Sequence, residues 1–259
     1  MTMPMQPDPQ ALRAWSGVEL AGPLAGGARN PVFLAWRGGQ RLVVRRSGRP
    51  AAALEWELGL LDHLRAHGIL TPEVLPADDG RRHVAGLLVH PFLHGHQPED
   101  SNDWRRVVDT LAAVHRLTSQ WPQRPGFASS RQLLTTVRGG DVRLDMMPAA
   151  AVRAVHAAWR PVLEGPECAI HADVGAGNVL LDGGKVALLD WDEARVDVPW
   201  FDFAFVPDDV PVPSPTDRET LKTAGVAWEA ATCWVVEPEY ARRCLAELLT
   251  RLGHAPPGQ

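Results

Sequence analysis

A carboxylate, an amide and a second carboxylate lie close together in the second half of the sequence. Asp173 precedes Asn178 by five positions in HADVGAGN, and Asp190 ends the apolar run KVALLD that follows. Carboxylate and amide oxygens suit magnesium, and a carboxylate can orient a hydroxyl that attacks a phosphate. The spacing matches H-x-D-x-x-x-x-N of kinase catalytic loops, followed by a metal-binding Asp. A lone HxD would be an ordinary turn, but this combination predicts phosphoryl transfer.

Strand patterns dominate the first third of the chain. In residues 17–48, apolar and polar side chains alternate as they do in strands. The runs 32–36 and 41–45 flank Gly38-Gly39, which predicts a hairpin. Leucines at three- and four-residue steps predict a helix over 52–68, which ends at Gly68. An apolar strand is expected over 84–89.

Helical patterns dominate the rest, over 104–117, 148–163, 216–232 and 238–252, whereas residues 118–147 show no clear pattern. Short strands interrupt them at CAIH, NVLL and KVALLD, the last two joined by a turn at Gly183-Gly184. We therefore expect an α+β fold with two lobes. A β-rich nucleotide-binding lobe would span 1–89, a hinge 90–97, and a mostly helical lobe for catalysis and acceptor binding 98–259, with the ligands in the cleft.

The motifs resemble those of the aminoglycoside phosphotransferase family, small-molecule kinases with a protein-kinase-like fold. The family pattern HGDxxxxN, (I/L)DW, a DP-like turn and D-(L/F)-A is represented by HADVGAGN, LLDWDEA, DVP and DFA. The resemblance implies that Asp173 is the catalytic base and that Asn178 and Asp190 hold Mg²⁺. It also implies that His171 braces the loop and that Asp202 ties it to the following helix. Two departures, Ala172 for Gly and VGA for Leu-His-Pro, concern loop packing more than charge.

The N-terminal half resembles the family's nucleotide site. LAGGARN, with Gly26, Gly27 and Asn30, corresponds to the loop whose amides cover phosphates, although a glycine pair is equally an ordinary hairpin turn. Arg45 stands where the family's strand carries a lysine, and its alternative is an exposed charge at a strand end.

The helix glutamate that pairs with this strand cation is expected to be Glu57. Glu55, on the opposite side of the helix, is the competitor, and a solvated helix face is the alternative for either. Backbone groups of Val89 and Pro91 would meet the purine edge. The nearby His90, His94 and His96 are assigned to the hinge, in preference to a metal site.

Acceptor specificity is expected from the helical lobe. Acidic residues crowd the segment after Asp190, and the candidates for acceptor contact are Asp192, Glu193, Asp197 and Trp200. Such a site would favour a polycation, such as an aminoglycoside or a basic peptide antibiotic, in resistance or self-protection. A nucleoside antibiotic, a sugar or an amino alcohol remains an alternative acceptor, and an ordinary acidic surface is the alternative explanation of the charges.

Composition limits the remaining possibilities. Hydrophobic residues make up 45% of the 259 residues and the net charge is −5, which argues against wholesale nucleic-acid binding. A start without a signal pattern, no membrane span and three scattered cysteines favour a cytoplasmic protein, as a monomer or homodimer. Its partners would be ATP or GTP, with Mg²⁺, and a small hydroxylated acceptor. A non-catalytic nucleotide-binding module is one rival. A protein kinase is the other, although DFG and APE motifs are missing.

Overall fold

The computed structural model describes residues 7–24 and 31–253. The described residues form two compact units. Of the described residues, those up to Gln97 together with Ala176–Asp192 form the first, and Pro98–Gly175 together with those from Glu193 onward form the second. The first unit thus contains a later segment of the chain that carries Asn178 and Asp190.

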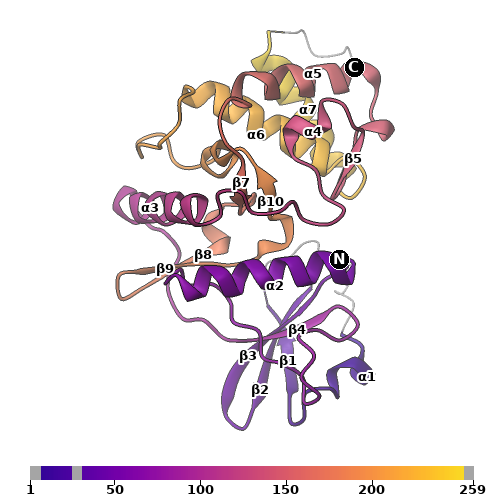
Figure 1. Ribbon diagram of the computed structural model, residues 1–259, viewed down its shortest axis with the longest axis vertical. Helices are drawn as coiled ribbons and strands as arrows, with labels where there is room; N and C mark the ends of the chain where they lie inside the picture. The colour runs from indigo at the N-terminus through magenta and orange to yellow at the C-terminus, as the bar shows by residue number, and fades with distance from the viewer. Residues whose placement is uncertain (1–6, 25–30, 254–259) are drawn as a thin grey trace. The chain divides into compact units, whose positions relative to one another are not determined.

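A four-stranded antiparallel sheet forms the base of the first unit, after a short helix α1 (Pro9–Leu12) (Figure 1). Its strands in spatial order are β1 (Glu19–Pro23), β2 (Val32–Arg37), β3 (Gln40–Arg46) and β4 (Leu87–Pro91). The predicted hairpin at Gly38-Gly39 is confirmed, with Val32 opposite Arg45 and Arg37 opposite Gln40.

The two faces of this sheet have different neighbours. Because side chains alternate along a strand, Phe33, Leu42, Val44 and Val89 share one face, where they pack in an apolar cluster around Trp15. Arg45 and His90 belong to the opposite face. This alternation decides which residues can line a ligand site.

The helix α2 (Ala51–Ala66) confirms the predicted helix over 52–68. It buries Leu54, Leu58, Leu61 and Leu64, which lie on one side of the helix. β4 begins three residues later than predicted, because Ala85 and Gly86 adopt positive φ values of 49° and 77° in a tight turn. The hairpin of β8 (Val179–Asp182) and β9 (Lys185–Leu188) completes the unit.

The second unit is mainly helical, with α3 (Ser101–Leu117), α4 (Ser130–Leu133), α5 (Ala149–Trp159), α6 (Arg218–Thr232) and α7 (Pro238–Arg251). Its core joins α5, α6 and α7 around Trp159 and Trp228. Helix α3 begins three residues before the predicted start, because the Asp100 side chain caps it through the amides of Asn102 and Asp103.

Small strands support the loops of the second unit. β7 (Cys168–Ile170) pairs with β10 (Arg195–Asp197), and β5 (Arg138–Gly139) pairs with β6 (Val142–Arg143). The segment 118–147, for which the sequence offers no pattern, holds α4, this second pair and a 3₁₀ turn over Leu144–Met146. Capping of α4 by Ser129 and Gln132 explains how so short a helix forms.

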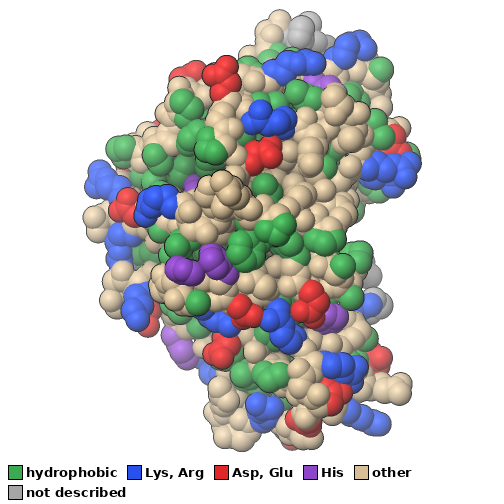
Figure 2. Space-filling view, viewed as in Figure 1, with side chains coloured by type: hydrophobic (Ala, Val, Ile, Leu, Met, Phe, Trp, Pro, Cys, Tyr) green, Lys and Arg blue, Asp and Glu red, His purple; other side chains and the backbone are tan. Residues whose placement is uncertain are grey.

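The surface carries mixed charges. On the face drawn in Figure 2, basic and acidic side chains are interspersed, and no extended field of one sign is visible. Within the described residues, none of the helices has both the length and the apolar character needed to cross a bilayer.

Candidate active site

The β8–β9 hairpin places Asn178 and Asp190 on neighbouring segments of the first unit. Val179 pairs with Leu188, and the amide of Leu189 donates to the carbonyl of Asn178 at 2.8 Å. Asp190 has a φ of 52°, a left-handed conformation that is uncommon for a residue with a side chain. Such backbone occurs in turns and also clusters at functional sites.

Arg45 bridges two carboxylates of the same unit. Its Nη2 donates to Glu57 Oε1, and its Nη1 lies 3.3 Å from Asp190 Oδ1. Burial lowers the pKa of Arg45, but the nearby charges of Glu57, Asp190 and Asp192 outweigh burial and raise this pKa overall. Glu57, and not Glu55, is therefore the helix partner of Arg45. Glu55 is exposed and pairs with His83 and Arg82.

These groups surround a cavity of about 250 Å³ in the first unit. That volume is near the lower end of small-molecule sites, which begin at roughly 300 Å³. Most of the wall is apolar, and the polar side chains are few. The lining residues that matter below are Arg45, Glu57, His90, Pro91, Asn178 and Asp190.

The last residues of β4 and the two that follow line part of this cavity. Pro91 lines it as predicted, whereas Val89 does not. The Val89 side chain belongs to the apolar cluster on the other face, and its carbonyl accepts from the amide of Leu75 at 2.8 Å. The prediction that Val89 meets a ligand is therefore corrected. The predicted loop residues Gly26, Gly27 and Asn30 lie outside the described residues.

Asp192 holds the segment after Asp190 in place. Its carboxylate accepts from Arg49 Nε at 2.9 Å and from the Ser47 hydroxyl at 3.2 Å, and the residue is 5% exposed. This corrects the prediction that Asp192 contacts an acceptor, because its carboxylate is buried in contacts that fix the loop to the end of β3.

The predicted base, Asp173, belongs to the second unit and is exposed. Its own amide donates to Nδ1 of the fully buried His171 at 3.3 Å, so His171 braces the turn. Ala172 between them has a φ of 71°. The position at which the resembled family has glycine thus has the left-handed backbone that glycine adopts most easily.

The carboxylate of Asp202 holds this turn in place through hydrogen bonds. Its carboxylate accepts from the amides of His171 at 3.0 Å and Ala172 at 2.7 Å, and from His115 Nε2 at 2.8 Å. Burial raises the pKa of Asp202, but the hydrogen bond and charge of His115, with the loop amides, lower it below its ordinary value. His115 was missed in the sequence, because a histidine inside a helix carries no signal of its distant partner.

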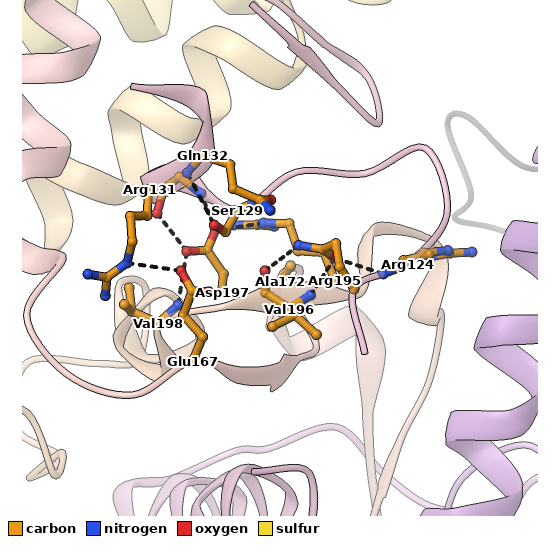
Figure 3. Close-up of polar contacts among 12 residues, drawn as sticks. Arg124, Ser129, Arg131, Gln132, Glu167, Ala172, Arg195, Val196, Asp197 and Val198 are labelled. Carbon is orange, nitrogen blue, oxygen red and sulfur yellow. Dashed lines mark hydrogen bonds and ion pairs between the residues drawn. The ribbon is translucent and has the colours of Figure 1, made fainter. Parts of the chain in front are cut away.

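Asp197 is fully buried in a separate network, part of which Figure 3 shows. Its oxygens accept from the Ser130 hydroxyl at 2.6 Å, the Ser130 amide at 2.9 Å and Arg195 Nε at 2.9 Å. An acceptor therefore cannot reach Asp197, which corrects the prediction of contact. Glu193 and Trp200 are both half-buried, and the Trp200 indole donates to the carbonyl of Glu164 at 3.2 Å.

A second cavity, of about 40 Å³, adjoins Asp173 within the second unit. Its wall combines aromatic rings with charged groups. The residues that matter below are Asp173, Arg195, Phe201, Phe205, Trp228 and Glu229. The Arg195 guanidinium carbon lies 3.3 Å from the centre of the Trp228 ring. None of Arg195, Trp228 and Glu229 is among the residues that the sequence predicts to contact the acceptor.

The sequence model of the phosphotransferase enzyme family (APH) matches residues 21–245. The chain belongs to this family. It is a small-molecule kinase. No curated protein matches the sequence.

Solved structures of phosphotransferases are similar in fold. A microcompartment-associated aminopropanol kinase is 18% identical, with a TM-score of 0.64 and 93% of each chain covered. Spectinomycin phosphotransferase APH(9)-Ia, in complex with ADP and spectinomycin, is 13% identical, with a TM-score of 0.61. The alignment covers 97% of this chain and 93% of that one. Choline kinase from Cryptosporidium parvum Iowa II is 12% identical, with a TM-score of 0.57. The alignment covers 92% of this chain and 90% of that one.

Proposed function

We propose that this phosphotransferase moves the γ-phosphate of ATP or GTP to a hydroxyl of a small amine-bearing molecule, with Asp173 as the base. The observation that supports the donor half is the cavity of the first unit, which is lined by a buried arginine, the Asn178 and Asp190 side chains, and the Pro91 segment. A guanidinium suits phosphate oxygens, and Glu57 holds that of Arg45 in position.

The donor set fits magnesium. Asn178 and Asp190 offer an amide oxygen and a carboxylate to one cavity, and Mg²⁺ favours one or two such protein ligands together with phosphates and water. Bound there, the ion would neutralise charge on the phosphates. The protein's own contributions are to hold the nucleotide through Arg45 and the Pro91 segment, and to orient the acceptor hydroxyl through Asp173.

The acceptor half rests on the cavity beside Asp173. Phe201, Phe205 and Trp228 contribute aromatic rings to its wall, with the Arg195 guanidinium over the Trp228 ring, and Glu229 adds a carboxylate to that of Asp173. The two carboxylates would attract an ammonium group. Two of the similar structures are an aminopropanol kinase and a choline kinase, which act on compact amine-bearing alcohols. We therefore place small amino alcohols first and larger aminoglycosides second.

The test is turnover of ATP and GTP, with magnesium, against a panel that includes aminopropanol, choline, spectinomycin and hygromycin B. Addition of one phosphate to a panel member, detected by mass, would establish the acceptor class. The variant Glu229→Gln should raise KM for an amine-bearing acceptor and leave KM for ATP unchanged. Glu239→Gln, an exposed carboxylate on α7, is the matched control. Phosphorylation restricted to amine-free sugars would contradict the proposed acceptor.

A further inference from the structure

The side chain of His90 is a buried polar group with no part in the phosphate and metal contacts proposed for Arg45, Asn178 and Asp190. It lies on β4 opposite Val43 of β3, lines the first unit's cavity and is 7% exposed. The alternation of the strand turns it to the same face as Arg45, away from the apolar cluster around Trp15. His90 therefore contributes a polar group to a wall that is mostly apolar.

The hydrogen bonding of His90 fixes its tautomer. Nδ1 lies 2.8 Å from the carbonyl oxygen of Glu73, and a carbonyl can only accept, so Nδ1 carries the proton. Burial, followed by the charge of Arg45, lowers the pKa of His90 to about 4, so the ring is neutral at neutral pH. Nε2 then has a lone pair and no hydrogen. Within the described part of the chain, Glu73 is the only hydrogen-bond partner of this ring.

The next residues add a second acceptor. Pro91 has no N–H and offers only its carbonyl, and the amide of Phe92 already donates to the carbonyl of Arg41 at 3.1 Å. His90 Nε2 and the Pro91 carbonyl are thus two acceptors, adjacent in the chain, whose residues line this cavity. A ligand edge that carries hydrogen-bond donors can pair with both, whereas an oxygen acceptor can pair with neither.

We propose that His90 selects nucleotides with a 6-aminopurine base, so that ATP is preferred to GTP. This inference rests on the proposed function of the cavity as the nucleotide site. The 6-amino group has two hydrogens, which can satisfy both acceptors. The 6-oxo group of guanine or hypoxanthine brings a third acceptor to the same place and leaves all of them unpaired, which is costly in a buried site.

The test uses dissociation constants, which do not require the acceptor to be known. Binding of MgATP, MgGTP and MgITP to the full chain is measured by competition with a fluorescent ATP analogue. ITP matters because it shares the 6-oxo group with GTP but lacks its 2-amino group. We expect ATP to bind at least tenfold more tightly than both GTP and ITP. In His90→Gln, whose amide can rotate to donate or accept, the ATP-to-GTP and ATP-to-ITP ratios should both fall at least fivefold.

The matched control is His94→Gln, an exposed histidine of the same segment, which should keep the wild-type ratios. Because each ratio is taken within one variant, a partly unfolded preparation does not alter it. Equal binding of all three nucleotides, rejection of GTP but not ITP, or unchanged ratios in His90→Gln would each overturn the inference alone. Failure of every nucleotide to bind would overturn the proposed nucleotide site as well.

Discussion

Arg45 Nη1 lies 3.3 Å from Asp190 Oδ1, so the strand cation directly contacts the carboxylate that we assign to the metal. The same guanidinium is held on its other side by Glu57, which is 2% exposed. One planar group thus joins helix α2, strand β3 and the segment after β9. A lysine has a single point charge and cannot copy this two-sided contact.

Arg45→Lys should therefore weaken binding of Mg-nucleotide about tenfold, the effect of losing one charge-assisted contact. The measurement is the dissociation constant by titration calorimetry. Arg46→Lys, the next residue of the strand, is the matched control and should bind as the wild type does. Equal affinity in Arg45→Lys and the wild type would contradict the role of Arg45.

Asp173→Ala should reduce kcat at least about 100-fold, as expected for loss of a positioned base, while nucleotide binding stays nearly unchanged. Single-turnover kinetics with an identified acceptor would measure the first effect and calorimetry the second. Asp182→Ala removes an exposed carboxylate at the end of β8 and serves as the control. Parallel loss of binding and turnover in Asp173→Ala would count against the assigned role.

His115→Phe should lower both stability and kcat, since it removes a donor from the buried carboxylate of Asp202. The expected loss is about 1–3 kcal/mol in the free energy of unfolding. Urea unfolding would measure it. His115→Gln keeps a side-chain N–H near the position of Nε2 and should recover part of both quantities. Equal unfolding free energies and equal kcat values for His115→Phe and His115→Gln would contradict a role for the hydrogen bond to Asp202.

Ala172→Gly should stabilise the protein, because the left-handed conformation at φ 71° costs a residue with a side chain roughly 1–2 kcal/mol. The extra freedom of glycine in the unfolded chain offsets about 0.5–1 kcal/mol. The two ranges together allow a net gain between about 0 and about 1.5 kcal/mol, which thermal unfolding would report. Ala150→Gly, at an exposed position of α5, should have the opposite sign.

Stability should fall as the pH is lowered from about 6.5 to about 4, and His90 should account for part of that fall. Its pKa of about 4 in the folded protein lies below the ordinary value near 6.5, so the unfolded state binds more protons in this window. The contribution is present above pH 6.5 and amounts to at most about 3 kcal/mol. Urea unfolding at pH 7 and pH 5 should show a smaller difference for His90→Gln than for the wild type. Equal differences would contradict this assignment.

The sequence alone indicated the reaction class and most local elements. Asp173, Asn178 and Asp190 can be proposed from it because phosphoryl transfer needs oxygen ligands and a carboxylate at a fixed spacing within one short segment. The hairpin at Gly38-Gly39 and helix α2 follow from alternation, turn residues and leucine spacing, all of which are local properties.

Only the tertiary structure decided which polar groups meet. Glu57 and Glu55 have the same chemistry, and strand packing selects Glu57 as the partner of Arg45, 12 positions away. His115 and Asp202 are 87 positions apart in the sequence and form a hydrogen bond. Asp192 and Asp197 are buried and bind arginine side chains of the protein instead of a ligand. Such contacts depend on which faces are buried against one another, and no short stretch of sequence records that. The same reason explains why Val89 joins the apolar cluster while its neighbour His90 lines the cavity.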